Sequence, residues 1–318
     1  GISYAAVVGR SVVVAFLVFL IVKEGWQTLQ EPVRFRHRNF YGTYTIWDVA
    51  SYPQDIRQLL HGRTIHGAQL LDPENRMTPI MYYFIGGGIA DVYETTPPGR
   101  RMAVLGLGAG AAASYVKPGE TMVYYEIDPD NEGIARHWFS FLDECRGRVR
   151  VVVGDGRLGL QNSDRLEPPY DIIHMDAFTG DGIPTHLLTR EAVRVYLERL
   201  SGNGVILFHV SNRYYELRPV IKAIAAELGL AGAVNVPTPK TELKANQSAT
   251  WCVVLARNPD RLAALVRKGW IPFGPGDGLR EVTPWTDDYI NILLPLRDGM
   301  RERWDGFNFA QWLKTLRP

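Results

Sequence analysis

The sequence predicts an α/β protein with a doubly wound, mostly parallel sheet. Two observations carry this prediction. Short apolar runs alternate with helical patterns from about residue 101 onward, which is typical of βαβ units. Acids and glycines follow the ends of these runs, and the carboxyl ends of parallel strands are where such sheets bind ligands. Ahead of this region, the sequence predicts one transmembrane helix and a small antiparallel β domain.

The clearest βαβ unit is residues 101–128, RMAVLGLGAGAAASYVKPGETMVYYEID. The apolar run 102–105 predicts a buried parallel strand, and an Ala-rich helix is expected over 109–116. A second strand is expected over 121–127. Three glycines follow the first strand and two acids close the second, namely Gly106, Gly108, Gly110, Glu126 and Asp128.

The glycine turn predicts a nucleoside site. Glycines let a ligand approach the backbone, and a helix N-terminus offers free N–H groups. Glu126 follows Gly106 by about 20 residues, the spacing at which an acid accepts the hydroxyls of a ribose. The alternative is a tight turn with an ordinary surface acid. The third glycine comes one residue earlier than in the dinucleotide fingerprint, so the pattern resembles the S-adenosylmethionine (SAM) site of class I methyltransferase-like Rossmann folds.

Composition narrows the functional classes. The 318 residues carry 35 Lys and Arg against 34 Asp and Glu, so no basic field argues for a nucleic-acid partner. Two cysteines, Cys145 and Cys252, cannot form a disulfide framework and match no metal-binding spacing. We therefore expect no metal site, and reduced thiols suit a cytoplasmic domain.

Residues 2–22, ISYAAVVGRSVVVAFLVFLIV, predict a membrane-spanning anchor. At about 1.5 Å per residue such a helix crosses roughly 30 Å of hydrocarbon. A signal peptide and a buried helix are the alternatives; no small-residue cleavage site follows, and the run is apolar on all faces. Basic residues follow the segment, so we expect a single-pass protein of the inner membrane with its soluble part in the cytoplasm: Lys23, Arg34, Arg36 and Arg38.

Residues 39–50 and 57–71 predict three strands of a small antiparallel sheet. His61 and His66 could be ligands here, although a structural role is the simpler interpretation. A helix is expected over 78–92, broken by the glycines at 86–88. Beyond the glycine turn we expect helices at 130–141, 187–200 and 219–228, and strands at 148–153, 171–175, 204–210, 234–239 and 249–255. The expected divisions are an anchor (1–25), the small domain (26–95), the SAM-binding-like domain (96–300) and a tail (301–318).

With these elements in place, the chain resembles the spermidine-synthase-like proteins of bacteria, in particular those that carry a membrane domain before the synthase domain. The resemblance covers nearly the whole predicted soluble part. It lies in NFYG at 39–42, LLHGRTIHGAQ at 59–69, GLGAG at 106–110, YYEIDP at 124–129, GDGR at 154–157, DAFTGDGIPTHLLTREA at 176–192, HVSNRY at 209–214 and WTDDYIN at 285–291.

The resemblance implies an aminopropyltransferase that uses decarboxylated SAM, or SAM, as co-substrate. Glu126 would hold the ribose, and Asp155 would face the adenine amino group. Asp176 and Asp181 would flank a polyamine-like acceptor in a loop that closes over the site, and one of them would take the proton of the attacking amine. Gln69 and Tyr83 would contact substrate. The glycines of the turn and Asp128 would complete the nucleoside site.

The acceptor side departs from the family pattern. The synthases have Asp-Gly where this chain has His66-Gly67, and Tyr-His-Glu where it has Tyr83-Phe84-Ile85. Two alternatives therefore stay open. One is a SAM-dependent methyltransferase on the same fold. The other is a non-catalytic accessory subunit of a larger membrane complex, respiratory or photosynthetic, with the aromatic-rich residues 303–318 as a docking helix; that segment could equally cap the core.

Overall fold

The computed structural model describes residues 14–20, 22, 33–50, 54–62, 64–178, 182–212, 215–239 and 242–292. Of the predicted membrane segment only 14–20 and 22 are described, and these are helical. None of the helices within the described ranges is long and apolar enough to span a bilayer. The C-terminal tail 301–318 and Asp181 lie outside the described residues.

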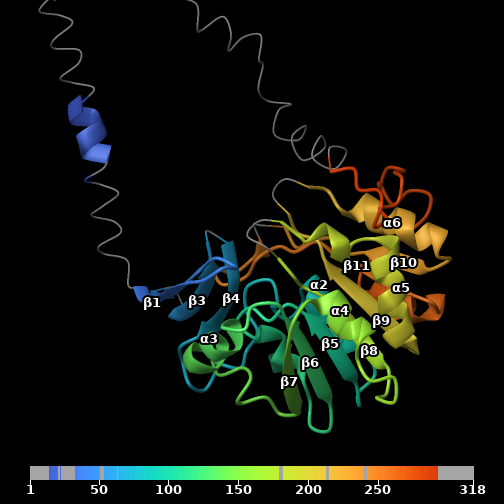
Figure 1. Ribbon diagram of the computed structural model, residues 1–318, viewed down its shortest axis with the longest axis horizontal. Coiled ribbons are helices and arrows are strands. Elements are labelled where there is room, and N and C mark those ends of the chain that lie inside the picture. The colour runs from blue at the N-terminus through green and yellow to red at the C-terminus, as the bar shows by residue number, and fades with distance from the viewer. Residues whose placement is uncertain are drawn as a thin grey trace, which may run out of the picture.

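The N-terminal domain is a four-stranded antiparallel sheet in the order β1-β2-β3-β4, formed by β1 (Val33–Arg38), β2 (Thr43–Val49), β3 (Ile56–His61) and β4 (Thr64–Leu70). Alternating residues of β2 are buried, which the aromatic and β-branched pattern of this stretch predicts. Strand β1 was not predicted, although its sequence VRFRHR alternates as a half-buried strand does, because its arginines were interpreted as the basic flank of a membrane segment. Figure 1 shows this sheet beside the larger one.

The second sheet has eight strands among the described residues, in the order β12-β10-β11-β9-β8-β5-β6-β7. Neighbours from β7 to β9 pair in parallel, whereas β11 pairs antiparallel with β9 and with β10. The strands are β5 (Arg101–Leu105), β6 (Thr121–Glu126), β7 (Arg148–Val153), β8 (Tyr170–Met175), β9 (Leu200–His209), β10 (Ala231–Val234), β11 (Cys252–Ala256) and β12 (Ile271–Pro272). The expected mostly parallel sheet is thus a mixed sheet with an antiparallel edge.

Helices cover both faces of this sheet (Figure 1). Alternate strand residues face opposite sides, so Met102 and Val104 enter one core cluster and Ala103 and Leu105 the other. The helical elements are α2 (Gly88–Thr95), η1 (Ala111–Tyr115), α3 (Asn131–Trp138), α4 (Gly156–Gln161), η2 (Thr185–Leu187), α5 (Arg190–Arg199), α6 (Arg218–Glu227), η4 (Pro259–Leu262) and α7 (Ala263–Arg267). The sheet is therefore doubly wound, as predicted.

Three sequence predictions about elements were wrong. The glycines at 86–88 do not break a helix; they begin one, because Gly87 is the N-cap of α2 and residues 78–87 form turns. A Cβ at Gly88 would lie 2.6 Å from the Asn235 amide nitrogen, so close packing requires the glycine. The helix expected over 109–116 is the short 3₁₀ element η1, which starts after a left-handed Gly110. The strand expected over 234–239 ends at Val234.

The chain order fixes where a ligand can bind. From β5 the chain moves outward to β6 and β7 on one side, and later returns to place β8 on the other side of β5. This reversal is the topological switch point, where the loops after two neighbouring strands diverge and leave a crevice. Gly106 follows β5 and Asp176 follows β8, so both lie at this point.

Candidate functional site

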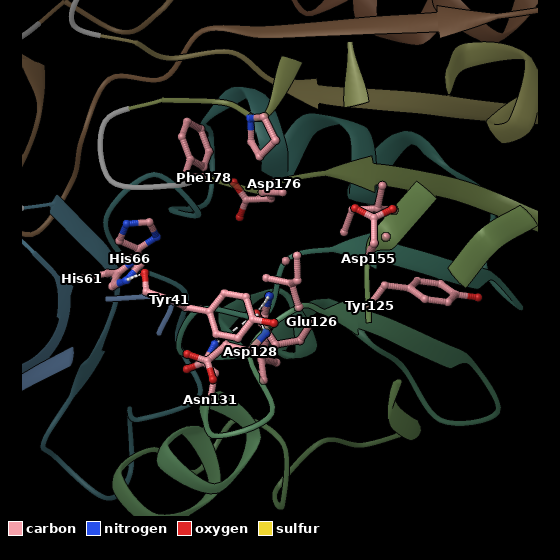
Figure 2. A pocket seen from close by; sticks show the side chains of 18 of the residues that line it. Tyr41, His61, His66, Tyr125, Glu126, Asp128, Asn131, Asp155, Asp176 and Phe178 are labelled. Atoms are coloured by element: carbon pink, nitrogen blue, oxygen red, sulfur yellow. Dashed lines mark hydrogen bonds between the residues drawn. The ribbon is translucent and has the colours of Figure 1, made fainter. Parts of the chain in front are cut away.

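A cavity lies at the carboxyl ends of β5, β6 and β8, and the N-terminal sheet contributes to its wall. It holds about 830 Å³ of empty space, including the solvent at its mouth, which is within the usual range for a small-molecule site. Figure 2 shows Glu126, Asp128 and Asn131 at one side, Asp176 and Phe178 opposite, and His61 and His66 between them. Its lining is Tyr41, Tyr44, His61, His66, Leu105, Gly106, Leu107, Gly108, Tyr125, Glu126, Ile127, Asp128, Asn131, Asp155, Gly156, Asp176, Ala177, Phe178, Pro184, His186 and Leu187.

Glu126, the last residue of β6, joins the two predicted parts of the nucleoside site. Its carboxylate accepts the Leu107 N–H of the glycine turn at 2.9 Å and the Asp128 N–H at 2.9 Å. The Asn131 side-chain amide donates to the same carboxylate at 3.1 Å. Burial raises the pKa of Glu126, although these donors act against the shift. The sequence therefore placed this acid correctly at the turn, where it is only 7% exposed.

The glycine turn is tight because other parts of the chain press against it. A Cβ at Gly106 would lie 2.5 Å from the Asp176 carbonyl oxygen, and one at Gly108 would lie 2.3 Å from the His66 carbonyl oxygen. Gly110 is also left-handed, with φ +81°. Besides the tight bend and the ligand approach expected from the sequence, the glycines thus let the chain at His66 and Asp176 pack against the turn.

The turn also keeps most of its N–H groups for the chain itself. Gly106 N–H donates to the Tyr125 carbonyl, Ala109 N–H to that of His66, and Gly110 N–H to that of Leu107. With the Leu107 N–H given to Glu126, few donors remain to bind a phosphate. This arrangement favours a nucleoside without phosphates over a nucleotide.

Asp128 holds the NFYG segment against the site. Both of its carboxylate oxygens accept from the Asn39 amide, at 2.9 and 2.8 Å, and the residue is 1% exposed. Tyr44 contributes a further hydrogen bond, and burial together with this bond raises the pKa of its phenol. Asp128 lines the cavity, but its carboxylate is already committed to neighbours within the chain.

Asp155 lies at the start of α4 and on the cavity wall. It caps the helix by accepting the Leu158 N–H at 2.9 Å, and its other oxygen lies 2.7 Å from His186 Nε2. Burial alone would raise the pKa of Asp155, but the Leu158 N–H and the His186 imidazole lower it. Two residues on, Arg157 binds both oxygens of Asp287 at 2.7 and 2.6 Å, which attaches the WTDD segment beside the site.

Asp176 contacts two polar side chains that lie far from it in the sequence. Its Oδ1 lies 2.6 Å from His209 Nδ1, and its Oδ2 accepts the Tyr83 hydroxyl. Burial alone would raise the pKa of Asp176, but the charge and hydrogen bond of His209 lower it below its usual value, with Tyr83 contributing. The carboxylate is therefore ionised at neutral pH. Behind it, burial lowers the pKa of His174 to about 4, so that imidazole is neutral.

Of the three other predicted site residues, Tyr83 and Gln69 do not line the described cavity. Tyr83 reaches the site through its bond to Asp176, but it is buried and does not line the cavity. Gln69 is turned away: its amide nitrogen donates to Ser140 Oγ at 2.9 Å and to the Arg76 carbonyl at 3.1 Å, and its oxygen accepts the Ser140 N–H. On β4, the Gln69 side chain is therefore engaged in hydrogen bonds within the protein. Asp181 belongs to a part of the loop that the structure does not describe.

Sequence reasoning missed three polar side chains, His209, His186 and Asn131. His209 ends β9, so its place at a strand end in the HVSNRY motif was a usable signal. Asn131 begins α3 directly after the acidic turn, and no local pattern distinguishes it from a helix cap. Among the described residues, no group of three or more His, Cys, Asp and Glu side chains could hold a metal ion.

Parts of the chain are similar to known proteins. The chain is 30% identical over 149 residues to the polyamine aminopropyltransferase of Vibrio vulnificus, covering 46% of this chain and 48% of that protein. It is 28% identical over 125 residues to the eEF1A lysine and N-terminal methyltransferase of Xenopus laevis, covering 36% and 18%. The chain thus spans about half the length, or less, of these curated relatives. No family model matches it.

Solved structures extend the likeness to the fold. A probable spermidine synthase from Corynebacterium glutamicum superposes with a TM-score of 0.57 at 17% identity, covering 79% of this chain and 97% of that one. Spermidine synthase from Thermotoga maritima gives a TM-score of 0.50 at 11% identity, covering 83% and 84%. The chain has the spermidine-synthase-like, class I methyltransferase fold. The fold by itself leaves the reaction open.

Proposed function

We propose that the chain is an aminopropyltransferase-like enzyme that binds decarboxylated SAM and transfers its aminopropyl group to an amine. One observation carries the proposal: Glu126 and Asp176 line the same cavity. Glu126 is hydrogen-bonded to the glycine turn, and Asp176 follows β8 and is held by His209. Glu126 is suited to bind the ribose of a nucleoside, and Asp176 is suited to accept a proton next to the reacting carbon.

The described residues fit such a co-substrate. The ionised Asp176 and the aromatic side chain of Phe178 lie opposite Glu126, and the His66 ring lies between the two sides. A carboxylate and ring faces both attract a cationic sulfonium or ammonium group. When bound, decarboxylated SAM supplies an electrophilic carbon beside a sulfonium.

Asp176 would position the acceptor and receive its proton. An amine attacks only in its neutral form, so a carboxylate must take the proton that the nitrogen loses as the new C–N bond forms and the C–S bond breaks, releasing methylthioadenosine. Because the pKa of Asp176 is lowered, it is a weak base that takes the proton only as the C–N bond forms, and its contact with His209 holds one of its oxygens in place. Tyr83 holds the other oxygen and fixes the orientation of the carboxylate.

A methyltransferase is the second candidate, because a segment of 125 residues is also similar to the Xenopus laevis methyltransferase. The two reactions leave different products. Aminopropyl transfer releases methylthioadenosine, whereas methyl transfer from SAM releases S-adenosylhomocysteine. Mass spectrometry of the products formed from each co-substrate with a panel of amines therefore separates the two candidates.

Binding is the first test. We expect calorimetry to show micromolar binding of methylthioadenosine to the full chain, weakened at least about tenfold by Glu126→Ala, since that change removes a buried charged acceptor. Glu132→Gln is the matched control, because this α3 carboxylate pairs with Arg136 outside the cavity. Absence of binding at millimolar ligand would contradict the proposal and favour the accessory-subunit alternative.

The membrane anchor at 2–22, the docking tail at 301–318 and a cytoplasmic face of the inner membrane stay predictions from the sequence. A subunit of a larger membrane complex would copurify with partners in mild detergent, whereas an enzyme acting alone would not need them.

A further inference from the structure

Asn131 carries an unused hydrogen-bond acceptor on the wall of the nucleoside cavity. The residue begins α3 directly after the acidic turn and is 2% exposed. Its side-chain nitrogen donates to Glu126 Oε2 at 3.1 Å. Its Oδ1 is buried and has no hydrogen-bond partner among the described residues. A carboxylate only accepts, so the nitrogen must face Glu126, and the amide orientation is fixed by chemistry.

An unsatisfied buried amide oxygen is unfavourable in the free protein. Leaving a buried acceptor without a donor forfeits the hydrogen bonds it would make in water. Native proteins satisfy nearly all such atoms, and an exception calls for an explanation such as a ligand. Asn131 lines the same cavity as Glu126, and Figure 2 shows the two on one side of it.

The donors already bound to Glu126 show why a second acceptor is useful. A carboxylate offers about four acceptor positions. Oε1 accepts the Asp128 N–H, and Oε2 accepts both the Leu107 N–H and the Asn131 amide. About one position is therefore left, whereas the two adjacent hydroxyls of a ribose bring two donors.

Asp128 is poorly placed to take the second hydroxyl. Its Oδ1 accepts from the Asn39 amide and from the Asp130 N–H, and its Oδ2 accepts from Asn39 as well. Asn131 Oδ1 lies on the same planar amide group as the nitrogen that contacts Glu126. Because Oδ1 has almost no accessible surface in the free protein, a hydroxyl bound beside that contact reaches it when the side chain or its neighbours move to admit the ligand.

We propose that Asn131 is a specificity-determining residue that accepts one of the two ribose hydroxyls, while Glu126 accepts the other. This inference rests on the proposed nucleoside site and adds a residue to it. A neutral amide oxygen and a carboxylate together select a ligand with two neighbouring O–H donors. They disfavour a deoxyribose, which leaves one acceptor unsatisfied, and a ribose phosphate, which Glu126 repels.

The test pairs changes in the ligand with changes in the protein. Calorimetry of the full chain would use methylthioadenosine and its 2′-deoxy and 3′-deoxy analogues. For the unmodified chain we expect each deoxy analogue to bind about tenfold more weakly or worse. In Asn131→Ala, one of these two penalties should fall below about threefold while the other persists. In Asn131→Gln, which keeps both an amide donor for Glu126 and an acceptor oxygen, both penalties should persist.

Any other result would contradict the inference. Two unchanged penalties in Asn131→Ala would mean that the amide does not meet the ribose. Two penalties that fall together, or that fall in Asn131→Gln as well, would mean that Asn131 only supports Glu126. Absence of nucleoside binding to the unmodified chain would overturn the proposed function along with the inference, whereas the preceding results overturn the inference alone. Circular dichroism confirms that each variant is folded.

Discussion

The two sides of the cavity are built in different ways. On the nucleoside side, Glu126 is held mainly by backbone N–H groups from its own turn and from the turn after β5. On the acceptor side, Asp176 is held by two side chains, His209 from β9 and Tyr83 from the segment before α2. Part of the acceptor loop, residues 179–181, lies outside the described ranges.

This difference shows which side can change more freely. Backbone donors are present whatever the sequence, so the nucleoside side is retained as long as the strand-turn-helix path is retained. The acceptor side depends on the identity of individual side chains and can be altered one residue at a time. The resemblance to the synthases is in line with this, because departures from their pattern at His66, Phe84 and Ile85 belong to the acceptor side.

The largest expected effect separates the two sides by function. Asp176→Asn should lower turnover about 100- to 10,000-fold, because an amide cannot take the proton of the amine. Methylthioadenosine affinity should stay within about threefold, since Glu126 is untouched. Steady-state kinetics with decarboxylated SAM and calorimetry give the two values. Unchanged turnover would remove Asp176 from the mechanism, and a parallel loss of binding would mean that the two sides are not independent.

The next prediction concerns the contact between Gly106 and Asp176, where the two sides of the cavity meet. Gly106→Ala should lower the free energy of unfolding by about 4 kcal/mol, because the added Cβ would lie 2.5 Å from the Asp176 carbonyl oxygen at a residue with φ +97°. Gly119→Ala is the matched control. Its φ is +84° but nothing lies within 4 Å of the added Cβ, so about 1–2 kcal/mol of backbone strain is expected. Urea unfolding measures both, and equal losses would contradict the close contact.

The smallest expected effect concerns acid sensitivity beneath the acceptor side. The pKa of His174 is about 4 in the folded chain and 6.5 in a model peptide. As pH falls from 6.5 towards 4, the unfolded chain gains a proton that the folded chain does not, so stability is lost across this window. At about 1.4 kcal/mol per pKa unit, the loss is about 3 kcal/mol.

His174→Phe removes this titration. The variant should lose about 2–3 kcal/mol less stability between pH 7 and pH 4.5 than the unmodified chain does, by urea unfolding at each pH. The slope is the diagnostic quantity, because the substitution also removes the contact between the Tyr93 hydroxyl and the imidazole. An unchanged slope in His174→Phe would show that another group dominates the acid response.

Much of the fold was readable from the sequence, because strand and helix periods are local. The antiparallel N-terminal sheet, the parallel strands and the double winding were all predicted, and the spacing from Gly106 to Glu126 placed the ribose-binding candidate at its turn. The errors came where packing overrides local preference. The glycines at 86–88 resemble a helix break, yet Gly88 begins a helix and is glycine because Asn235 leaves no space for a side chain.

What the sequence alone determined about this protein is therefore the location of its acids at strand ends, because each strand carries its own last residue to the shared edge of the sheet. Only the tertiary structure decided which side chains meet there. Asp176 and His209 are 33 residues apart and become partners because β8 and β9 are neighbours in the sheet. Gln69 turned to Ser140, and Asn131 was left with a free oxygen, because a side chain's partners depend on what packs against it.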